Sequence, residues 1–379
     1  MQKIAHKSYS LFFTRISVVL LAFLITAQGC KKQPQQLKDF EQVNLVANKA
    51  GYGATHTDPQ FINGWGIAFA PSGPAWVSAN GTGLSVIYNS LGDVVRPPVT
   101  IPSPTASTGG QPTGAVFNSN STTNPGEFKL SNGNPARFIF AGTDGVISGW
   151  NGGNAAELVL NDAPDAVYTG LAMASDGAAN FIYAANFKEA KIDVYDKDWK
   201  EVEKPFMDPT LPAGYSPFNI QNIGGKLYVM YAKVGSDGEE EVGPGNGYVD
   251  IYNPNGSLVR RFASRGALNA PWGVALAPAG FFDDNDGDGV MNNAENMPKN
   301  GNIGAVILVG NFGNGHINAY NEFGMSLGQL RRHGQPIVID GLWAISFAPA
   351  TATTVNPGWL FFAAGPNDEK DGLFGYITK

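Results

Sequence analysis

Short apolar runs recur along the chain and are separated by segments rich in glycine, proline and asparagine. Each run alternates around a small residue, as a short buried strand does, and no long segment has the spacing of an amphipathic helix. The runs are GWGIAFAP (64–71), PTGAVFN (112–118), YTGLAMA (168–174), PFNIQNI (217–223), PWGVALAP (271–278) and LWAISFAP (342–349). The pattern predicts an all-β protein with many turns.

A second and a third apolar run follow each of these six segments. The second runs are AWVSANG, RFIFAGTDG, FIYAANF, KLYVMYA, VILVGNFGNG and WLFFAAG, and the third runs are LSVIYN, VISGWN, KIDVYD, YVDIYN, HINAYN and GLFGYITK. Most third runs end in an aromatic residue followed by Asn or Asp, which suits the start of a turn. We therefore expect one three-stranded unit to be repeated six times.

The spacing of the unit indicates the architecture. Equivalent small positions are Gly66, Gly114, Gly170, Asn219, Gly273 and Ala344, at steps of 48, 56, 49, 54 and 71 residues. The first four steps match a β-propeller blade of about 40 to 50 residues with loop variation. The last step is longer by about twenty residues, which predicts an insertion of about 281–302 in the fifth blade.

The sixth unit ends after its third strand, so a four-stranded blade would keep an unpaired outer edge there. The segment FEQVNLVAN (40–48) precedes the first repeat and can supply the missing strand. We therefore predict a six-bladed β-propeller over residues 40–379. Its ring would be closed by an N-terminal strand that completes the last blade.

The fifth unit, NAPWGVALAP followed by VILVGNFGNGHINAYNEFG, resembles an NHL-type propeller repeat. Over residues 40–379 the chain more closely resembles an uncharacterised family of exported bacterial propeller proteins. The segments FINGWGIAF, GTDGVISGW, SPFNIQNIGGKLYVMYA, ALNAPWGVALAPAGF and DGLFG carry that match. The resemblance implies the fold and export, and it implies no known chemistry.

The first thirty residues have the layout of an export signal. Basic residues Lys3, Lys7 and Arg15 come before a short apolar stretch that ends in AQGC, and Cys30 is the only cysteine. The stretch is too short for a permanent membrane span. AQGC resembles a bacterial lipobox, so we expect lipid modification at Cys30 and a polar tether over 31–39. The alternative is an ordinary secretory signal with an unrelated cysteine.

The net charge narrows the classes of binding partner that the protein could have. The formal charge is −7, and removal of residues 1–30 would leave 22 basic against 32 acidic residues, a charge of −10. An acidic surface disfavours nucleic acid and anionic membrane surfaces. We expect membrane contact through the lipid alone, in the cell envelope.

The segment DDNDGDGVMNNAE (283–295) concentrates acidic residues in a lightly charged chain. It matches the D-x-D-x-D-G-x5-E calcium loop, in which alternate oxygen ligands point inward and Gly289 permits the sharp bend. The predicted ligands are Asp284, Asp286, Asp288, the carbonyl of Val290, Asn292 and Glu295. No amphipathic helices flank the loop, so calcium is expected as a structural cofactor. The alternative is a solvated acidic linker.

In a propeller, loops that enter first strands and loops that join second to third strands gather around the channel on one face. The predicted ligand-binding residues on that face are Asp58, Trp65, Asp144, Asn186, Asn219, Trp272, Asn311, Asp340 and Trp343. Aromatic rings and amides suit a small molecule, a glycan or a protein. Alternatively the tryptophans pack between blades, and the asparagines form turns.

Two classes of function follow from these residues. One is a binding or scaffold propeller without catalytic residues. The other is a metal-dependent hydrolase of the lactonase type, with a channel ion held by members of one carboxylate and amide set: Asp58, Asp144, Asp340, Asn186, Asn219 and Asn311. No motif of a serine hydrolase or of haem attachment is present in the sequence. The residues favour binding.

Overall fold

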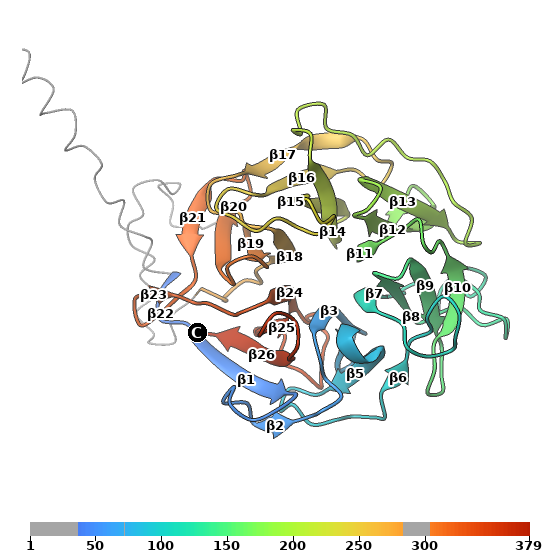
Figure 1. Cartoon of the computed structure of the whole chain (residues 1–379), viewed down its shortest axis with the longest axis horizontal. Helices are drawn as coiled ribbons and strands as arrows, with labels where there is room; N and C mark the ends of the chain where they lie inside the picture. The colour runs from blue at the N-terminus through green and yellow to red at the C-terminus, as the bar shows by residue number, and fades with distance from the viewer. Residues whose placement is uncertain (1–36, 72, 283–303) are drawn as a thin grey trace, which may run out of the picture.

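The six repeats fold as six sheets of mainly antiparallel strands set around a central axis, as blades of a propeller (Figure 1). The structure is a computed structural model and describes residues 37–71, 73–282 and 304–379. Apart from a short 3-10 helix, Asn80–Thr82, the described elements are strands. No helix within these residues is long and apolar enough to cross a membrane. The predicted export signal, Cys30 and calcium loop 284–295 lie outside the described residues.

The predicted strands are confirmed in every blade. The first strands are β3 (Gly64–Phe69), β7 (Pro112–Phe117), β11 (Tyr168–Asp176), β14 (Tyr215–Ile223), β18 (Pro271–Leu276) and β24 (Leu342–Phe347). The second strands are β4 (Ala75–Ala79), β8 (Phe138–Gly142), β12 (Ala179–Asn186), β15 (Lys226–Lys233), β19 (Val306–Asn311) and β25 (Leu360–Ala364). The third strands are β5 (Leu84–Tyr88), β9 (Val146–Trp150), β13 (Lys191–Asp196), β16 (Tyr248–Tyr252), β20 (Ile317–Asn321) and β26 (Leu373–Thr378).

The outer strands are less regular. They are β6 (Val99–Thr100), β10 (Glu157–Asn161), β17 (Leu258–Ser264), β21 (Ser326–Gln329) and, in blade 6, β1 (Glu41–Ala47) with the short β2 (His56–Thr57) beside it. Blade 3 has three strands, and residues 200–202 follow the edge of β13 through bonds to Asp196 and Val194. A short hairpin, β22 (Arg331–Arg332) and β23 (Gln335–Pro336), leads from blade 5 to blade 6.

The ring closes as the sequence predicts. Strand β1 pairs antiparallel with β26, from Glu41 opposite Thr378 to Ala47 opposite Leu373. The strand therefore gives the last blade its outer strand. The packed structure begins slightly earlier than residue 40, because Leu37 is buried in one core cluster with Phe40, Phe281 and Phe282.

The small residue of each repeat is required by crowding at the axis. A Cβ on Gly66 would lie 2.4 Å from the carbonyl oxygen of Thr113 in blade 2. A Cβ on Gly114 would lie 2.4 Å from the backbone nitrogen of Leu171 in blade 3. Real side chains do not come this close to backbone, so glycine lets neighbouring first strands approach.

Candidate functional site

Four aromatic side chains meet at the centre of the propeller and form what we call the aromatic plug: Trp65, Phe218, Trp272 and Trp343. The rings of Trp65 and Trp343 are stacked with centroids 3.5 Å apart. Trp272 packs edge-on against Trp65 at 6.1 Å and against Trp343 at 6.0 Å. All four residues are buried. Each directly precedes the small position of its repeat, so the sequence pattern itself brings blades 1, 4, 5 and 6 together at the axis.

Hydrogen bonds fix the plug to the surrounding blades. Trp272 Nε1 donates to the carbonyl oxygen of Thr169 at 2.9 Å, and Asn219 Nδ2 donates to the carbonyl oxygen of Trp272 at 2.8 Å. Trp343 Nε1 donates to Asn63 Oδ1 at 3.1 Å. Trp65 Nε1 has no partner among the described residues. The predicted residues Trp65, Asn219, Trp272 and Trp343 are thus brought together, and the three indoles pack between blades.

A cavity of about 370 Å³ adjoins the plug on the side toward which the first strands run. First strands of blades 1, 2, 3, 4 and 6 form its walls, and Trp272 of blade 5 also borders it. We call this space the channel cavity. Its lining is mostly apolar and includes Ile67, Val116, Met173, Ile345 and Phe347, together with the amides of Asn219, Gln221 and Asn222. The residues near its outer end lie at the carboxyl ends of the strands, opposite the face that the sequence predicts.

Backbone groups add polarity to the channel cavity. Strands β3, β7, β11, β14 and β24 each stand at the end of their sheet, so only one edge is paired within the blade. The other edge presents amide and carbonyl groups toward the axis. Small-molecule sites commonly combine a concave, mainly apolar wall of this size with a few hydrogen-bonding groups. The geometry suits a bound small molecule.

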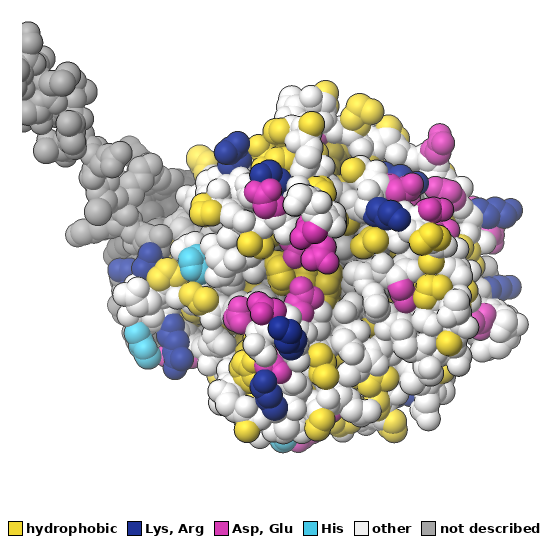
Figure 2. Space-filling view, viewed as in Figure 1, with side chains coloured by type: hydrophobic (Ala, Val, Ile, Leu, Met, Phe, Trp, Pro, Cys, Tyr) yellow, Lys and Arg dark blue, Asp and Glu magenta, His cyan; other side chains and the backbone are white. Residues whose placement is uncertain are grey.

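Acidic residues that were not predicted as site residues lie on the other side of the plug, and one of them, Glu369, is connected to it through Asn63. Asn63 Nδ2 donates to Glu369 Oε2 at 2.6 Å, and Asn63 also accepts from Trp343. Burial raises the pKa of Glu240 to about 7, and the charge of Glu369 adds to the shift. Burial also raises the pKa of Glu369. Figure 2 shows acidic side chains gathered around the centre of one face. The run GEEE (238–241) was the available signal.

The other predicted polar residues have separate local partners. Asp58 accepts from the Tyr88 hydroxyl at 2.8 Å, Asp144 from the Gln111 backbone N–H at 3.3 Å, and Asp340 from the Asn367 backbone N–H at 2.9 Å. Asn311 Nδ2 donates to the carbonyl oxygen of Ala267 at 2.8 Å. Within residues 37–71, 73–282 and 304–379, no group of three or more His, Cys, Asp or Glu is placed to hold a metal ion.

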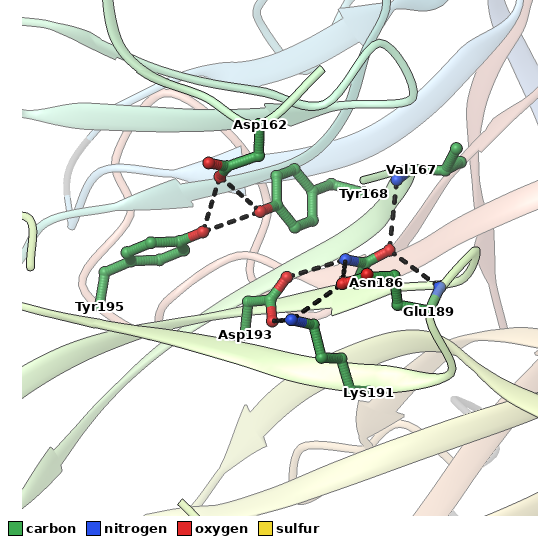
Figure 3. A network of polar contacts seen from close by, with 8 residues as sticks. All are labelled: Asp162, Val167, Tyr168, Asn186, Glu189, Lys191, Asp193 and Tyr195. Atoms are coloured by element: carbon green, nitrogen blue, oxygen red, sulfur yellow. Dashed lines mark hydrogen bonds and ion pairs between the residues drawn. The ribbon is translucent and has the colours of Figure 1, made fainter. Parts of the chain in front are cut away.

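Asn186 belongs to a polar network in blade 3, where β11 begins, β12 ends and β13 begins (Figure 3). It donates to Asp193 Oδ2 at 2.9 Å, and Lys191 Nζ lies 3.0 Å from Asp193 Oδ1. Beside it, Asp162 Oδ2 accepts from the hydroxyls of Tyr168 at 2.7 Å and Tyr195 at 2.8 Å.

The network also borders a polar cavity of about 290 Å³. The donors of Asn186, Lys191 and both tyrosines are directed at carboxylates of the network itself. Such internal pairing is what buried polar groups need in a stable fold. We therefore assign the network a structural role, in which it ties the loop before β11 to blade 3.

Comparison with solved structures supports the fold of the chain. No protein-family model matches the chain. A structural genomics protein of unknown function from Bacteroides thetaiotaomicron superposes with a TM-score of 0.52 and 10% identity over 89% of this chain and 76% of that one, which shows the fold alone.

Two proteins of Acanthamoeba polyphaga mimivirus are closer in sequence. "Uncharacterized protein R648" is 33% identical over 88% of this chain and 79% of its own length. "Uncharacterized protein L690" is 31% identical over 89% of this chain and 86% of its own length. The six-bladed fold implied by the resemblance to bacterial propellers is confirmed, while bacterial export stays a prediction. The chain belongs to the protein family that includes the mimivirus proteins R648 and L690.

Proposed function

We propose that the protein is a binding propeller that holds a small molecule in the channel cavity. The observation that carries this proposal is the cavity itself: about 370 Å³, walled by five blades and bordered by Trp272. The aromatic plug fills the axis beside it, so the cavity is a pocket at one end of the channel. The predicted polar residues are engaged in holding loops and blades together, which supports binding over catalysis.

A compound screen on the native protein and on a variant with a larger side chain at the cavity wall tests this function. The intact protein is heated with a panel of small neutral and charged compounds, and shifts in melting temperature are recorded. Ala115 lines the cavity and Ala179 is exposed on β12, so Ala115→Leu and Ala179→Leu form a matched pair. We expect stabilising compounds to lose their effect in Ala115→Leu alone. Retention of the effect in Ala115→Leu would place binding elsewhere, and turnover of a panel lactone would favour the hydrolase alternative.

We further propose that the protein is exported and anchored in the cell envelope through a lipid on Cys30. The support is the sequence: a basic leader, a short apolar stretch and AQGC. Growth of an expressing bacterium with a labelled fatty acid should label the protein, and Cys30→Ser should abolish the label. Label that persists in Cys30→Ser would overturn lipidation at this residue.

We also propose that calcium orders the insertion through Asp284, Asp286, Asp288, Val290, Asn292 and Glu295. Both ends of the insertion are fixed, because Phe281 and Val306 are buried in one core cluster. The metal content of the purified protein tests the site. One calcium per chain should be lost in Glu295→Ala and kept in Glu239→Ala, which changes an exposed acidic residue elsewhere. An ion that survives Glu295→Ala would lie at another site.

A further inference from the structure

The wall of the channel cavity carries no charged side chain. None of the residues that line it, all within the described part of the chain, is Asp, Glu, Lys, Arg or His. This composition stands out because 32 acidic and 25 basic residues are available in the sequence. On the other side of the aromatic plug, Glu369 is connected to it through Asn63, and the charge of Glu369 contributes to the raised pKa of Glu240.

An uncharged wall selects against a charged ligand. A carboxylate or an ammonium that enters the cavity gives up part of its water, and no opposite charge on the wall replaces that water. A neutral molecule loses much less on entry. The electrostatics of the cavity therefore distinguish ligands by charge before any detailed contact is made.

The wall also offers apolar surface that the fold itself does not cover. Ile67, Val116, Met173 and Phe347 line the cavity and are only half-buried. Contact with apolar groups removes such surface from water and is favourable. The unbranched thioether of Met173 can adapt to different shapes. The wall thus suits a mainly hydrocarbon or aromatic body.

A half-buried amide on the wall is free to bind. Asn219 donates to the carbonyl oxygen of Trp272 and accepts from the Ile220 N–H. The half-buried amide of Gln221 makes no side-chain hydrogen bond to the described residues. An amide both donates and accepts. A neutral amide, alcohol or carbonyl group on the ligand could therefore be matched there.

Taken together, these features define a ligand class. We propose that the channel cavity binds an uncharged, mostly apolar small molecule that carries one neutral hydrogen-bonding group. The inference rests on the proposed binding function and specifies its ligand. The volume of about 370 Å³ sets a small size, near the lower end of typical ligand pockets.

A matched series of probes tests the charge rule. Octanamide, octanoate and octylammonium share one chain length and differ in the charge of the head group. Titration calorimetry on the intact protein at pH 7 should show octanamide binding about tenfold or more tightly than either ion. Absence of octanamide binding, or tighter binding of an ion, would overturn the inference.

Variants separate the ligand class from the site. Met173→Lys adds a cation to the wall, and we expect octanoate to become the tightest of the three probes. Met207→Lys adds the same charge at a residue that is 69% exposed elsewhere, and the order of probes should stay unchanged.

Ala115→Leu supplies the remaining control, because it enlarges an apolar side chain that lines the cavity without adding charge. If octanamide binds equally well to Ala115→Leu, the probe lies outside the cavity and the binding function assigned to this site fails with it. If Ala115→Leu blocks every probe while an ion binds best to the native protein, the site stands and only the ligand class is wrong.

Discussion

The indole Nε1 of Trp272 in blade 5 donates a hydrogen bond of 2.9 Å to the backbone carbonyl oxygen of Thr169 in blade 3. The two residues are 103 positions apart in sequence and belong to blades that are not neighbours. Trp272 is therefore a strut across the axis as well as a part of the aromatic plug.

Trp272→Phe should destabilise the protein more than removal of an indole at the surface. The change keeps an aromatic ring but leaves the buried carbonyl of Thr169 without its donor, at a cost of about 1–3 kcal/mol. Trp199 is the matched control, since its Nε1 donates at 2.8 Å to the carbonyl of Lys129 in an exposed setting. Urea unfolding should show a clearly smaller loss for Trp199→Phe. Equal losses of unfolding free energy in the two variants would contradict a stabilising role for the bond between Trp272 and Thr169.

Gly114→Ala should reduce stability through a clash at the axis. The added Cβ would lie 2.4 Å from the backbone nitrogen of Leu171, so blades 2 and 3 would have to move apart. We expect a loss of about 1–3 kcal/mol in the free energy of unfolding. At Gly126 the same change meets nothing within 4 Å. Gly126→Ala should be near neutral in the same denaturation experiment, and a similar loss there would argue against crowding.

Asp371→Asn should weaken the closure of the ring in a pH-dependent way. Burial alone would raise the pKa of Asp371, but bonds from Lys49, Tyr52, Asn48 and Asn367 outweigh it and hold the pKa well below its usual value. Because the folded pKa is lowered, the stabilisation is present above about pH 4 and is lost as the pH falls.

The measurement is urea unfolding of the wild type and Asp371→Asn at pH 7 and pH 3. The variant should lose about 2–3 kcal/mol at pH 7 and somewhat less at pH 3, because this stabilisation is lost only gradually as the pH falls toward the lowered folded pKa. Asp368→Asn, at a side chain that is 91% exposed, should change little at either pH. A pH-independent loss in Asp371→Asn would show that the carboxylate charge is not what matters.

Glu240→Gln should stabilise the protein at alkaline pH. Burial raises the pKa of Glu240 to about 7, so the folded state holds this proton more tightly than the unfolded state. The corresponding stability is present below about pH 4 and is lost as the pH rises through about 7. The variant avoids that loss, by roughly 1–3 kcal/mol at pH 8 and almost nothing at pH 4.

Glu241→Gln provides the comparison for this site. Glu241 is exposed and pairs with Lys233 at 2.6 Å, a surface ion pair that contributes little. Chemical denaturation at pH 4 and pH 8 should therefore separate the two variants. Identical pH profiles for Glu240→Gln and the wild type would rule out a buried, ionising carboxyl at this position.

The fold could be predicted from the sequence because its strands repeat. Gly66, Gly114, Gly170 and Gly273 recur where blades crowd at the axis, and the segment 40–48 was needed to complete blade 6. The missing outer strand of blade 3 could not be predicted, because outer strands share no repeated residues. The weak pairing of residues 200–202 depends on the local turn at Asp196.

The candidate site was predicted only in part. The sequence predicted Trp65, Trp272 and Trp343 on one face around the channel or, alternatively, packed between blades. The hydrogen bond from Trp272 to Thr169 depends on the arrangement of distant blades. The channel cavity depends on side-chain volumes from five first strands together, so no single motif marks it. Glu369 is separated from Asn63 by 306 positions, and only the fold brings them into contact.

The pairing of β1 with β26 has a kinetic consequence. Strand β1 is made early and its partner last, so blade 6 cannot form until nearly all of the chain is available. Contacts between residues so distant in sequence slow folding, because a very long loop must close first. Blades 1 to 5 can fold while β1 is still unpaired, and the pairing of β1 with β26 is then the final step. If residues 1–30 act as the proposed export leader, the ring stays open until β26 has been made, which leaves time for transport of an open chain.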